Sequence, residues 1–273
     1  ADVKIHVLSH GLHYASCVFE GERVYDGEIF KLEEHTERLF HSAYRMGFRI
    51  PYDKKTINKA CKDIVEIQKV KNGYVRPVAW RGSEMMAISA QKTKIHVAIA
   101  SWEWGSYFDP NLKLKGIRLN ISKWKRPAPD TIPWDTKASG LYMICTLSKH
   151  EAEQEGFTDS LMLDYEGNIA EATGANIFFK NKSGELHTPI PDSFLNGITR
   201  RCIIEIAKSK GIKIFERKIK PKEMADFIGC FLTGTAAEVT PVSQIDKYNF
   251  SVCDVIKDLS ESYQAMVRKK TAA

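Results

Sequence analysis

TIPWDTKASGLY, Thr131 to Tyr142, is the stretch around which the chain is organised. It belongs to a loop with several prolines, which lack a backbone donor and disfavour helix in the residue before them. From Ser139 onward apolar residues recur at helical spacing, and Ser139 can act as an N-cap. We therefore expect a helix to begin just after Lys137, with Lys137 beside its N-terminus.

The position of Lys137 suits an amine that acts as a nucleophile. The positive end of a helix dipole and any burial both disfavour an ammonium, so we expect the pKa of Lys137 to be lowered. A neutral amine is what Schiff-base chemistry with a carbonyl compound or with pyridoxal phosphate requires. Taken alone, a lysine in such a place is more often solvated than catalytic. A catalytic role for Lys137 therefore needs support from other residues of the sequence.

Length and composition indicate an ordinary globular protein with two domains. The chain has 273 residues, of which 43% are hydrophobic and 27% are charged. We expect a small N-terminal α/β domain over residues 1–124, an interdomain loop over 125–136, and a large C-terminal domain over 137–273 that carries Lys137. The net charge of +6 is spread along the chain, which favours small anionic ligands over a nucleic-acid groove.

Cysteine usage and hydropathy predict a cytoplasmic protein. The six cysteines include no CxxC pair, so we expect them to be reduced and expect no metal site. No apolar stretch approaches the roughly 18 residues that a membrane helix needs, and no leader-like segment opens the chain.

Apolar periodicity predicts an α+β first half and a mixture of strands and helices in the second half. Asp26-Gly27 reads as a hairpin turn. The expected strands are residues 4–10, 15–25, 28–30, 74–80, 94–101, 116–124, 160–164, 169–180, 213–219 and 227–233. The expected helices are residues 32–46, 54–70, the segment after Lys137, 198–210 and 254–268.

Three further segments carry candidate chemistry. Glu171 lies in an apolar strand, where an unpaired carboxylate is costly; it either points to water at a strand edge or stabilises a protonated pyridine nitrogen. Leu195 to Arg201 places Asn196 and Gly197 before a helix, and Thr233 to Thr235 follow a strand, so both segments present backbone N–H groups that suit an anion or ordinary capping.

Two arginines are candidates for anion binding. Arg38 borders the apolar stripe of its expected helix, where it either pairs with Glu34 or meets a ligand. Tyr74 and Arg76 alternate along a strand and share one side, so they either form a cross-strand ion pair or together bind a carboxylate.

Together these segments resemble the branched-chain amino-acid aminotransferases, a family of fold-type IV pyridoxal-phosphate enzymes. The resemblance spans nearly the whole chain, in the family's order. The matching stretches are LSHGLHYASCVFEG (8–21), EEHTERLFHSA (33–43), YVRP (74–77), SKWKRPAPDTIPWDTKASGLY (122–142), NIAEATGANIFF (168–179), GITR (197–200) and GTAAEVTPV (234–242).

The resemblance implies a two-domain, D-amino-acid-aminotransferase-like fold with the active site at the domain junction. It also implies a role for each matching residue in binding pyridoxal 5'-phosphate. Lys137 would form the Schiff base and shuttle the proton, Glu171 would hold the ring nitrogen, and Tyr142 the ring oxygen. The phosphate-binding set would be Arg38, Ile198, Thr199 and Thr235.

On the substrate side the resemblance implies a site for both carboxylate and apolar groups. Tyr74 with backbone N–H groups of Thr235 and Ala236 would bind the α-carboxylate, and Arg76 the distal carboxylate of glutamate. The apolar wall would be Phe19, Gly21 and Trp124. Tyr14 matches a residue that the family supplies from the neighbouring subunit, so the likeness implies a homodimer.

The implied activity is a ping-pong amino transfer between L-leucine, L-isoleucine or L-valine and 2-oxoglutarate, giving branched-chain 2-oxo acids and L-glutamate, a step of branched-chain amino-acid biosynthesis. The alternatives are a D-amino-acid or amine transaminase, an aminodeoxychorismate lyase, and a basic binding module without activity. The YVRP pattern at Tyr74 favours the branched-chain enzymes over the first two, and the coincidence of Lys137, Tyr142 and Glu171 argues against the third.

Two departures from the family pattern modify these expectations. Relatives carry a strand or two before the SHGLHY stretch, so we expect this N-terminus to be trimmed. The segment WRGSEMMAIS, Trp80 to Ser89, lacks a glycine-rich loop, and Trp102 and Trp104 add bulk nearby, which would alter the substrate range.

Overall fold

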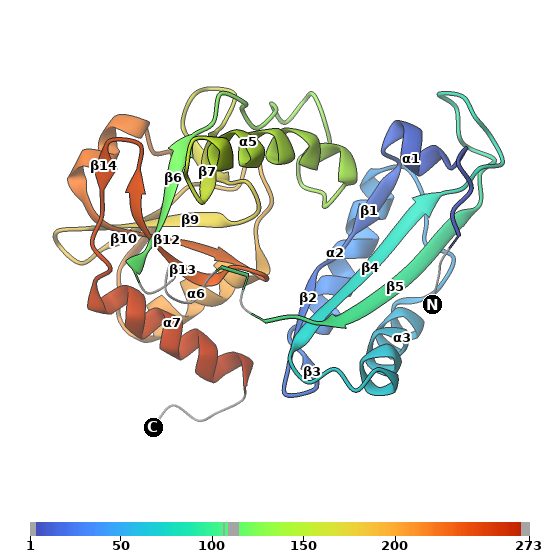
Figure 1. Cartoon of the computed structure of the whole chain (residues 1–273), viewed down its shortest axis with the longest axis horizontal. Coiled ribbons are helices and arrows are strands. Elements are labelled where there is room, and N and C mark those ends of the chain that lie inside the picture. Colours follow the sequence, from blue (N-terminus) through green and yellow to red (C-terminus); the bar gives the residue numbers. More distant parts are fainter. Residues whose placement is uncertain (1–3, 106, 109–114, 269–273) are drawn as a thin grey trace. The chain divides into compact units, whose positions relative to one another are not determined.

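The computed structural model describes residues 4–105, 107–108 and 115–268 (Figure 1). The chain divides into two compact units, residues 1–105 with 136–143 (unit 1) and residues 106–135 with 144–273 (unit 2). This division differs from the sequence-based one, which placed Lys137 at the start of the second domain. The difference has a local cause: Val18 forms a β-bridge with Ala138, and the Phe19 N–H donates to Lys137 O at 3.1 Å.

Unit 1 contains an antiparallel sheet of β1 (Cys17–Phe19), β2 (Glu22–Tyr25), β3 (Glu28–Ile29), β4 (Gly73–Arg81) and β5 (Ile95–Glu103). Strands β1 and β2 follow one another along the same edge of β4, and β5 pairs with β4 along its whole length. Glu20 and Gly21 form the interruption between β1 and β2. The chain therefore leaves the regular ladder at the point where the sequence reads Phe-Glu-Gly.

Two amphipathic helices accompany this sheet, α2 (Leu32–Arg45) and α3 (Lys54–Ile67), after a short α1 (His10–Tyr14). They pack on each other, with α2 against β1 and α3 against β4 and β5 (Figure 1). Each buries one apolar stripe, as their sequences predict. Asp53 caps α3 by accepting from the Thr56 N–H at 2.7 Å.

Unit 2 is built on a mixed sheet that closes on itself. Its strands are β6 (Ile117–Ile121), β7 (Asp159–Leu163), β8 (Ile169–Ala172), β9 (Asn176–Asn181), β10 (Leu186–Thr188), β11 (Ile214–Glu216), β12 (Phe227–Gly234), β13 (Glu238–Ile245) and β14 (Tyr248–Asn249). The order runs β11-β10-β9-β12-β13-β6-β7-β8, and β8 also pairs with β9. The closing pair is Glu171 with Asn176.

The helical segments of unit 2 are α5 (Met143–Gln154, entering from unit 1), α6 (Ile198–Ser209), the 3₁₀ helix η2 (Pro221–Asp226) and α7 (Asp254–Val267). Helices α6 and α7 pack together, α6 also on β12 and α7 on β13. Among the described residues, none of the helices combines the length and apolar character needed to cross a membrane.

Several element predictions are confirmed, while others are wrong or incomplete. The expected strand over residues 4–10 is instead a turn, because the Ser9 N–H and hydroxyl both donate to His6 O and α1 begins directly after Ser9. The expected single strand over 169–180 is a hairpin of β8 and β9, closed by Ala172 N–H donating to Ala175 O. Strand β13 was not predicted, because Pro241 lies in its middle.

Within the described part of unit 1, one buried acid has no evident partner. Glu22, on β2, is 0% exposed, and among the described residues neither carboxylate oxygen has a hydrogen-bond partner. Burial, together with the nearby Glu20 carboxylate, raises the pKa of Glu22 well above its ordinary value. Burial and the neighbouring Glu20 therefore favour the neutral form of the Glu22 carboxyl in the folded protein.

Replacing Glu22 should stabilise the protein, in a pH-dependent way. Because its pKa is higher in the folded state than in the unfolded state, its penalty on folding is absent below the ordinary value of 4.5 and grows as the pH rises above it. Glu22→Leu should increase the free energy of unfolding by roughly 1–3 kcal/mol at pH 7. Glu22→Gln should increase it at pH 8 and leave it unchanged near pH 4.

Urea unfolding of both variants at pH 4, 6 and 8 measures this effect. Glu33→Gln, at an exposed position of α2, is the matched control and should change little at any pH. A stabilisation by Glu22→Gln that does not vary with pH would contradict a titrating Glu22.

Candidate active site

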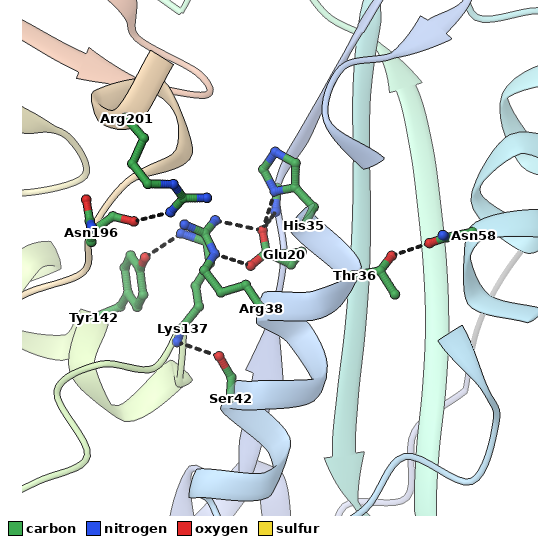
Figure 2. Close-up of polar contacts among 11 residues, drawn as sticks. Glu20, His35, Thr36, Arg38, Ser42, Asn58, Lys137, Tyr142, Asn196 and Arg201 are labelled. Carbon is green, nitrogen blue, oxygen red and sulfur yellow. Dashed lines mark hydrogen bonds and ion pairs between the residues drawn. The ribbon is translucent and has the colours of Figure 1, made fainter. Parts of the chain in front are cut away.

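Lys137 is held beside β1 by its own backbone. Its N–H donates to the Ser42 hydroxyl of α2 at 3.0 Å, and its carbonyl accepts from Phe19 N–H. The half-buried side chain reaches Tyr142, with 2.6 Å between Nζ and the phenol oxygen (Figure 2). The sequence prediction that Lys137 and Tyr142 belong to one site is thus consistent with their direct contact.

The chain turns helical just after Lys137, as expected, but not in the expected form. The first turn is a 3₁₀ helix, η1 (Ser139–Tyr142), preceded by Ala138 and without a side-chain cap, so the predicted N-cap role of Ser139 is wrong. Only then does α5 begin. A single 3₁₀ turn has a small dipole, so it contributes little positive field at Lys137.

The expected lowering of the Lys137 pKa is also wrong for the chain as it stands. Burial lowers the pKa of this ammonium, but Tyr142, Glu20 and Tyr74 outweigh burial and the repulsion from Arg38, so the pKa lies above its ordinary value. The amine is therefore protonated at neutral pH. It donates a hydrogen bond to Tyr142.

A buried acid near Lys137 was missed by the sequence analysis. Glu20 is 0% exposed and accepts from Arg38 Nε at 2.6 Å, Arg38 Nη2 at 2.9 Å, His35 Nδ1 at 2.7 Å and Gly21 N at 3.2 Å (Figure 2). Burial alone would raise the pKa of Glu20, but Arg38 and His35 hold it well below its usual range. Arg38 thus pairs with Glu20 and not with Glu34, whose nearby cation is Lys31.

Phe19, Tyr74 and Arg76 gather on one side of β4. The Arg76 guanidinium carbon lies 4.7 Å from the centre of the Phe19 ring and 5.5 Å from that of Tyr74, and Phe19 also packs on Tyr142 at 4.9 Å. In the register Arg76 faces Ala100, so the cross-strand ion pair is excluded. The buried Arg76 Nε has no hydrogen-bond partner among the described residues.

Gly21 and Trp104 fix the position of the Tyr74 phenol. A Cβ at Gly21 would lie 1.8 Å from the Tyr74 hydroxyl oxygen, so only glycine lets this ring occupy its place. Trp104 meets the Tyr74 ring edge-on at 4.7 Å, and Trp102 lies at 5.3 Å. Burial raises the pKa of Tyr74, so its hydroxyl remains a donor. The sequence analysis noted Trp104 for the bulk of its side chain. Its position in the sequence gave no indication that it contacts Tyr74.

In unit 2 Glu171 is buried, which rules out the interpretation that it points to water from a strand edge. It is 9% exposed, Arg126 Nε lies 3.4 Å from Oε1, and Asn176 Nδ2 donates to Oε2 at 3.2 Å. Neither Arg126 nor Asn176 was predicted as part of the site. Arg126 lies in the proline loop that the sequence analysis treated as a linker, and Asn176 faces Glu171 only because the strand folds back.

Asn176 also ties Glu171 to the start of α6. Its side chain donates to Leu195 O at 3.0 Å and accepts from Gly197 N–H at 3.1 Å. A Cβ at Gly197 would lie 2.3 Å from Asn176 Oδ1, so this approach requires glycine. No side chain caps α6 at Gly197, and the buried Ile198 and Thr199 form its first turn. Such a helix start offers backbone N–H groups to an anion.

The other predicted residues occupy loops and element ends. Thr235 and Ala236 are half-buried in the turn between β12 and β13, next to Thr233, whose buried hydroxyl has no partner among the described residues. Trp124 follows β6 and is 41% exposed. Tyr14 ends α1, is also 41% exposed, and stacks on His10 at 4.5 Å.

The described residues contain no group of histidine, cysteine, aspartate and glutamate side chains that could hold a metal ion. The polar groups around Lys137 and Glu171 are instead an amine, a phenol, guanidinium groups, amides and carboxylates. The amine, phenol, guanidinium and amide groups can donate to an organic anion, and the amine, phenol and carboxylates can exchange protons.

Comparison with known proteins matches this arrangement to one family. Residues 17–245 match the family model for class IV aminotransferases. A protein of Rickettsia conorii named "Probable branched-chain-amino-acid aminotransferase" is 44% identical over 270 residues, covering 97% of this chain and 91% of the relative. The branched-chain-amino-acid aminotransferase of Pseudomonas aeruginosa is 38% identical over 279 residues, covering 100% and 91%.

Solved structures give the same result. The branched-chain amino acid aminotransferase of Escherichia coli superposes with a TM-score of 0.95 at 34% identity, covering 99% of this chain and 92% of that one. The enzyme of Thermoproteus uzoniensis, solved with norvaline, superposes with a TM-score of 0.93 at 33% identity, covering 98% and 91%.

A third solved relative carries the cofactor in its aminated form. This branched-chain amino acid aminotransferase with pyridoxamine 5'-phosphate has a TM-score of 0.95 at 35% identity, covering 99% of this chain and 91% of that one. The same enzyme was also solved with N-(5'-phosphopyridoxyl)-L-glutamate and with 4-methylvaleric acid. The chain therefore belongs to the class IV aminotransferases, in the branched-chain amino-acid aminotransferase family of fold-type IV enzymes.

Proposed function

We propose that this chain moves the amino group of L-leucine, L-isoleucine and L-valine to 2-oxoglutarate, giving the branched-chain 2-oxo acids and L-glutamate. The observation that carries the proposal is the 2.6 Å contact of Lys137 Nζ with the Tyr142 phenol in a chain of this family. Two ligands of the relative solved with pyridoxamine 5'-phosphate support the two substrates: one is a phosphopyridoxyl adduct of L-glutamate, and the other is a branched aliphatic acid.

Like its relatives, the chain works with pyridoxal 5'-phosphate. The residues present fit this group: an amine with a phenol at hydrogen-bond distance, a buried carboxylate, an uncapped helix start and an arginine held by an acid. The cofactor supplies an electron-poor ring that stabilises negative charge at the substrate α-carbon.

Each cofactor-binding residue has a proposed task. Lys137 attaches the cofactor covalently, Tyr142 binds the ring oxygen, and the carboxylate of Glu171 keeps the ring nitrogen protonated, with Arg126 and Asn176 fixing the position of that carboxylate. The phosphate is held by Arg38, Ile198, Thr199 and Thr235.

Lys137 also moves the proton that amino transfer requires. As a free amine, Nζ would take the proton from the substrate α-carbon and pass it on to complete the amino transfer. Tyr142, at 2.6 Å, holds Nζ in place for both transfers. Nζ can take this proton only as the neutral amine, a form that burial favours and that Tyr142, Glu20 and Tyr74 oppose.

On the substrate side one pocket accepts an aliphatic chain and a carboxylate in turn. Tyr74 and the backbone N–H groups of Thr235 and Ala236 bind the α-carboxylate. The isobutyl group of leucine packs on Phe19, Gly21 and Trp124. Arg76, whose Nε has no partner among the described residues, receives the distal carboxylate of glutamate.

The exposed Tyr14 completes the pocket of a second copy, so the working unit in this proposal is a homodimer. The chemistry therefore depends on self-association. Dilution below the dissociation constant of the dimer should reduce activity together with assembly.

An amino-donor panel tests the substrate assignment. Purified protein with pyridoxal 5'-phosphate should form glutamate from 2-oxoglutarate with the L forms of leucine, isoleucine and valine, and not with their D forms or with simple amines. Preference for a D-amino acid or an amine would instead support the other transaminases of this fold.

A further inference from the structure

Among the described residues, Arg38 is hydrogen-bonded along one edge of its guanidinium group. Its Nε and Nη2 atoms donate to the two oxygens of Glu20, at 2.6 and 2.9 Å, and neither bond uses Nη1. This two-point contact fixes the plane of the guanidinium and the direction in which Nη1 points. A flexible side chain with about 2 kcal/mol of rotamer entropy is thereby ordered before any ligand arrives.

Glu20 is in turn fixed from several directions. It is fully buried in the break between β1 and β2, where its own N–H donates to Pro77 O at 2.8 Å. His35, one helical turn before Arg38 on α2, holds the same carboxylate at 2.7 Å. Burial lowers the pKa of His35, and the positive charges of Arg38 and Lys137 add to this effect, although Glu20 opposes it. The ring is therefore neutral, and its Nδ1–H donates to the Glu20 carboxylate.

The charges of this group favour a role in orientation. The negative charge of Glu20 compensates the positive charge of Arg38. Glu20 also favours the protonated form of Lys137, whereas Arg38 disfavours that form. A buried arginine present only to attract anions would be weakened by such a partner. An arginine that has to present one edge in a fixed direction benefits from an acidic partner, because the partner holds the guanidinium group in that orientation.

We propose that Glu20, supported by His35, is the positioning residue for Arg38, which it orients to bind the phosphate of the cofactor through its Nη1 edge. This inference rests on the proposed function, because it takes Arg38 as a phosphate-binding residue. Glu20 acts through Arg38 and does not contact the cofactor. Its loss affects the part of cofactor affinity that comes from the phosphate.

The test compares pyridoxal 5'-phosphate with pyridoxal, which differs only in lacking the phosphate. Dissociation constants for both are measured by absorbance titration of the cofactor-free protein at pH 7.5. The ratio of the pyridoxal constant to the pyridoxal 5'-phosphate constant reports the phosphate contribution. Glu20→Gln keeps the shape but loses the charge, and should lower this ratio about tenfold or more. Damage to the fold would weaken both ligands equally and leave the ratio unchanged.

Glu22→Gln is the matched control, because Glu22 is an equally buried acid two residues along the chain whose carboxylate has no hydrogen-bond partner among the described residues. It should leave the ratio unchanged. Arg38→Ala tests the underlying assignment and should lower the ratio at least as much as Glu20→Gln. An unchanged ratio in Arg38→Ala would overturn the phosphate role of Arg38.

A lowered ratio in Arg38→Ala with an unchanged ratio in Glu20→Gln would overturn the positioning role alone. Glu20→Asp withdraws the carboxylate by one methylene and decides the question if Glu20→Gln does not fold. It should also lower the ratio, although less, and an unchanged ratio would count against the inference.

Discussion

Lys137→Ala should reduce amino transfer by more than about 10³-fold, because in the proposed function it removes both the attachment point of the cofactor and the base that moves the α-proton. The fold should survive, since the contacts of Lys137 with Ser42 and Phe19 run through its backbone. Turnover with L-leucine and 2-oxoglutarate measures the loss. Sodium borohydride should fix the cofactor to a tryptic peptide containing Lys137 in the parent protein and to no peptide in the variant.

Lys59→Ala is the matched control, because this side chain is 76% exposed and pairs with Asp63 on the same helix. It should retain full activity and full labelling. Turnover in Lys137→Ala within tenfold of the parent, or borohydride labelling at another lysine, would remove Lys137 from its role.

Arg76→Ala should weaken the use of glutamate and 2-oxoglutarate by about 10²-fold in kcat/KM while changing leucine much less. A contact between a guanidinium and a carboxylate contributes about 1.5–3 kcal/mol, which accounts for most of this loss. Leucine has no distal carboxylate, so it does not make this contact. Measuring the half-reaction with leucine and the half-reaction with glutamate separately gives kcat/KM for each substrate independently.

Arg118→Ala serves as the control, because this arginine is in unit 2, donates to Gln244 and lies over Phe157. It should leave both half-reactions unchanged. Equal losses for leucine and glutamate in Arg76→Ala would mean that Arg76 supports the position of Phe19 and Tyr74, which it touches, and does not bind the substrate carboxylate.

Local patterns predicted most elements of the fold because those elements are set by short-range periodicity. The stripes of α2 and α3 and the runs of β4 and β5 are of this kind. Residues 4–10 alternate like a strand, but they form a turn instead, because the Ser9 N–H and hydroxyl donate to His6 O. Strand β13 contains a proline that only its tertiary setting tolerates, opposite Phe231 in the register.

The sequence singled out Lys137 and Glu171 as candidate site residues but not the side chains that contact them. Lys137 and Glu171 were identified because a lysine before a helix and an acid in an apolar strand are unusual. Glu20 is an equally unusual acid within the strand that the sequence predicted over residues 15–25, and Arg38 at the border of the α2 stripe was the available signal for a partner. Arg126 and Asn176 gave no such signal, because their contacts with Glu171 depend on long-range folding.

The return of residues 136–143 to the first unit has a consequence for synthesis of the chain. The polypeptide leaves unit 1 after Gly105 and comes back at Thr136, so the ladder position beside Val18 is filled only when this later segment has emerged from the ribosome. Until then the outer edge of β1 is unpaired, and open strand edges are where nascent chains associate wrongly. The segment that carries Lys137 thus also covers this edge of β1.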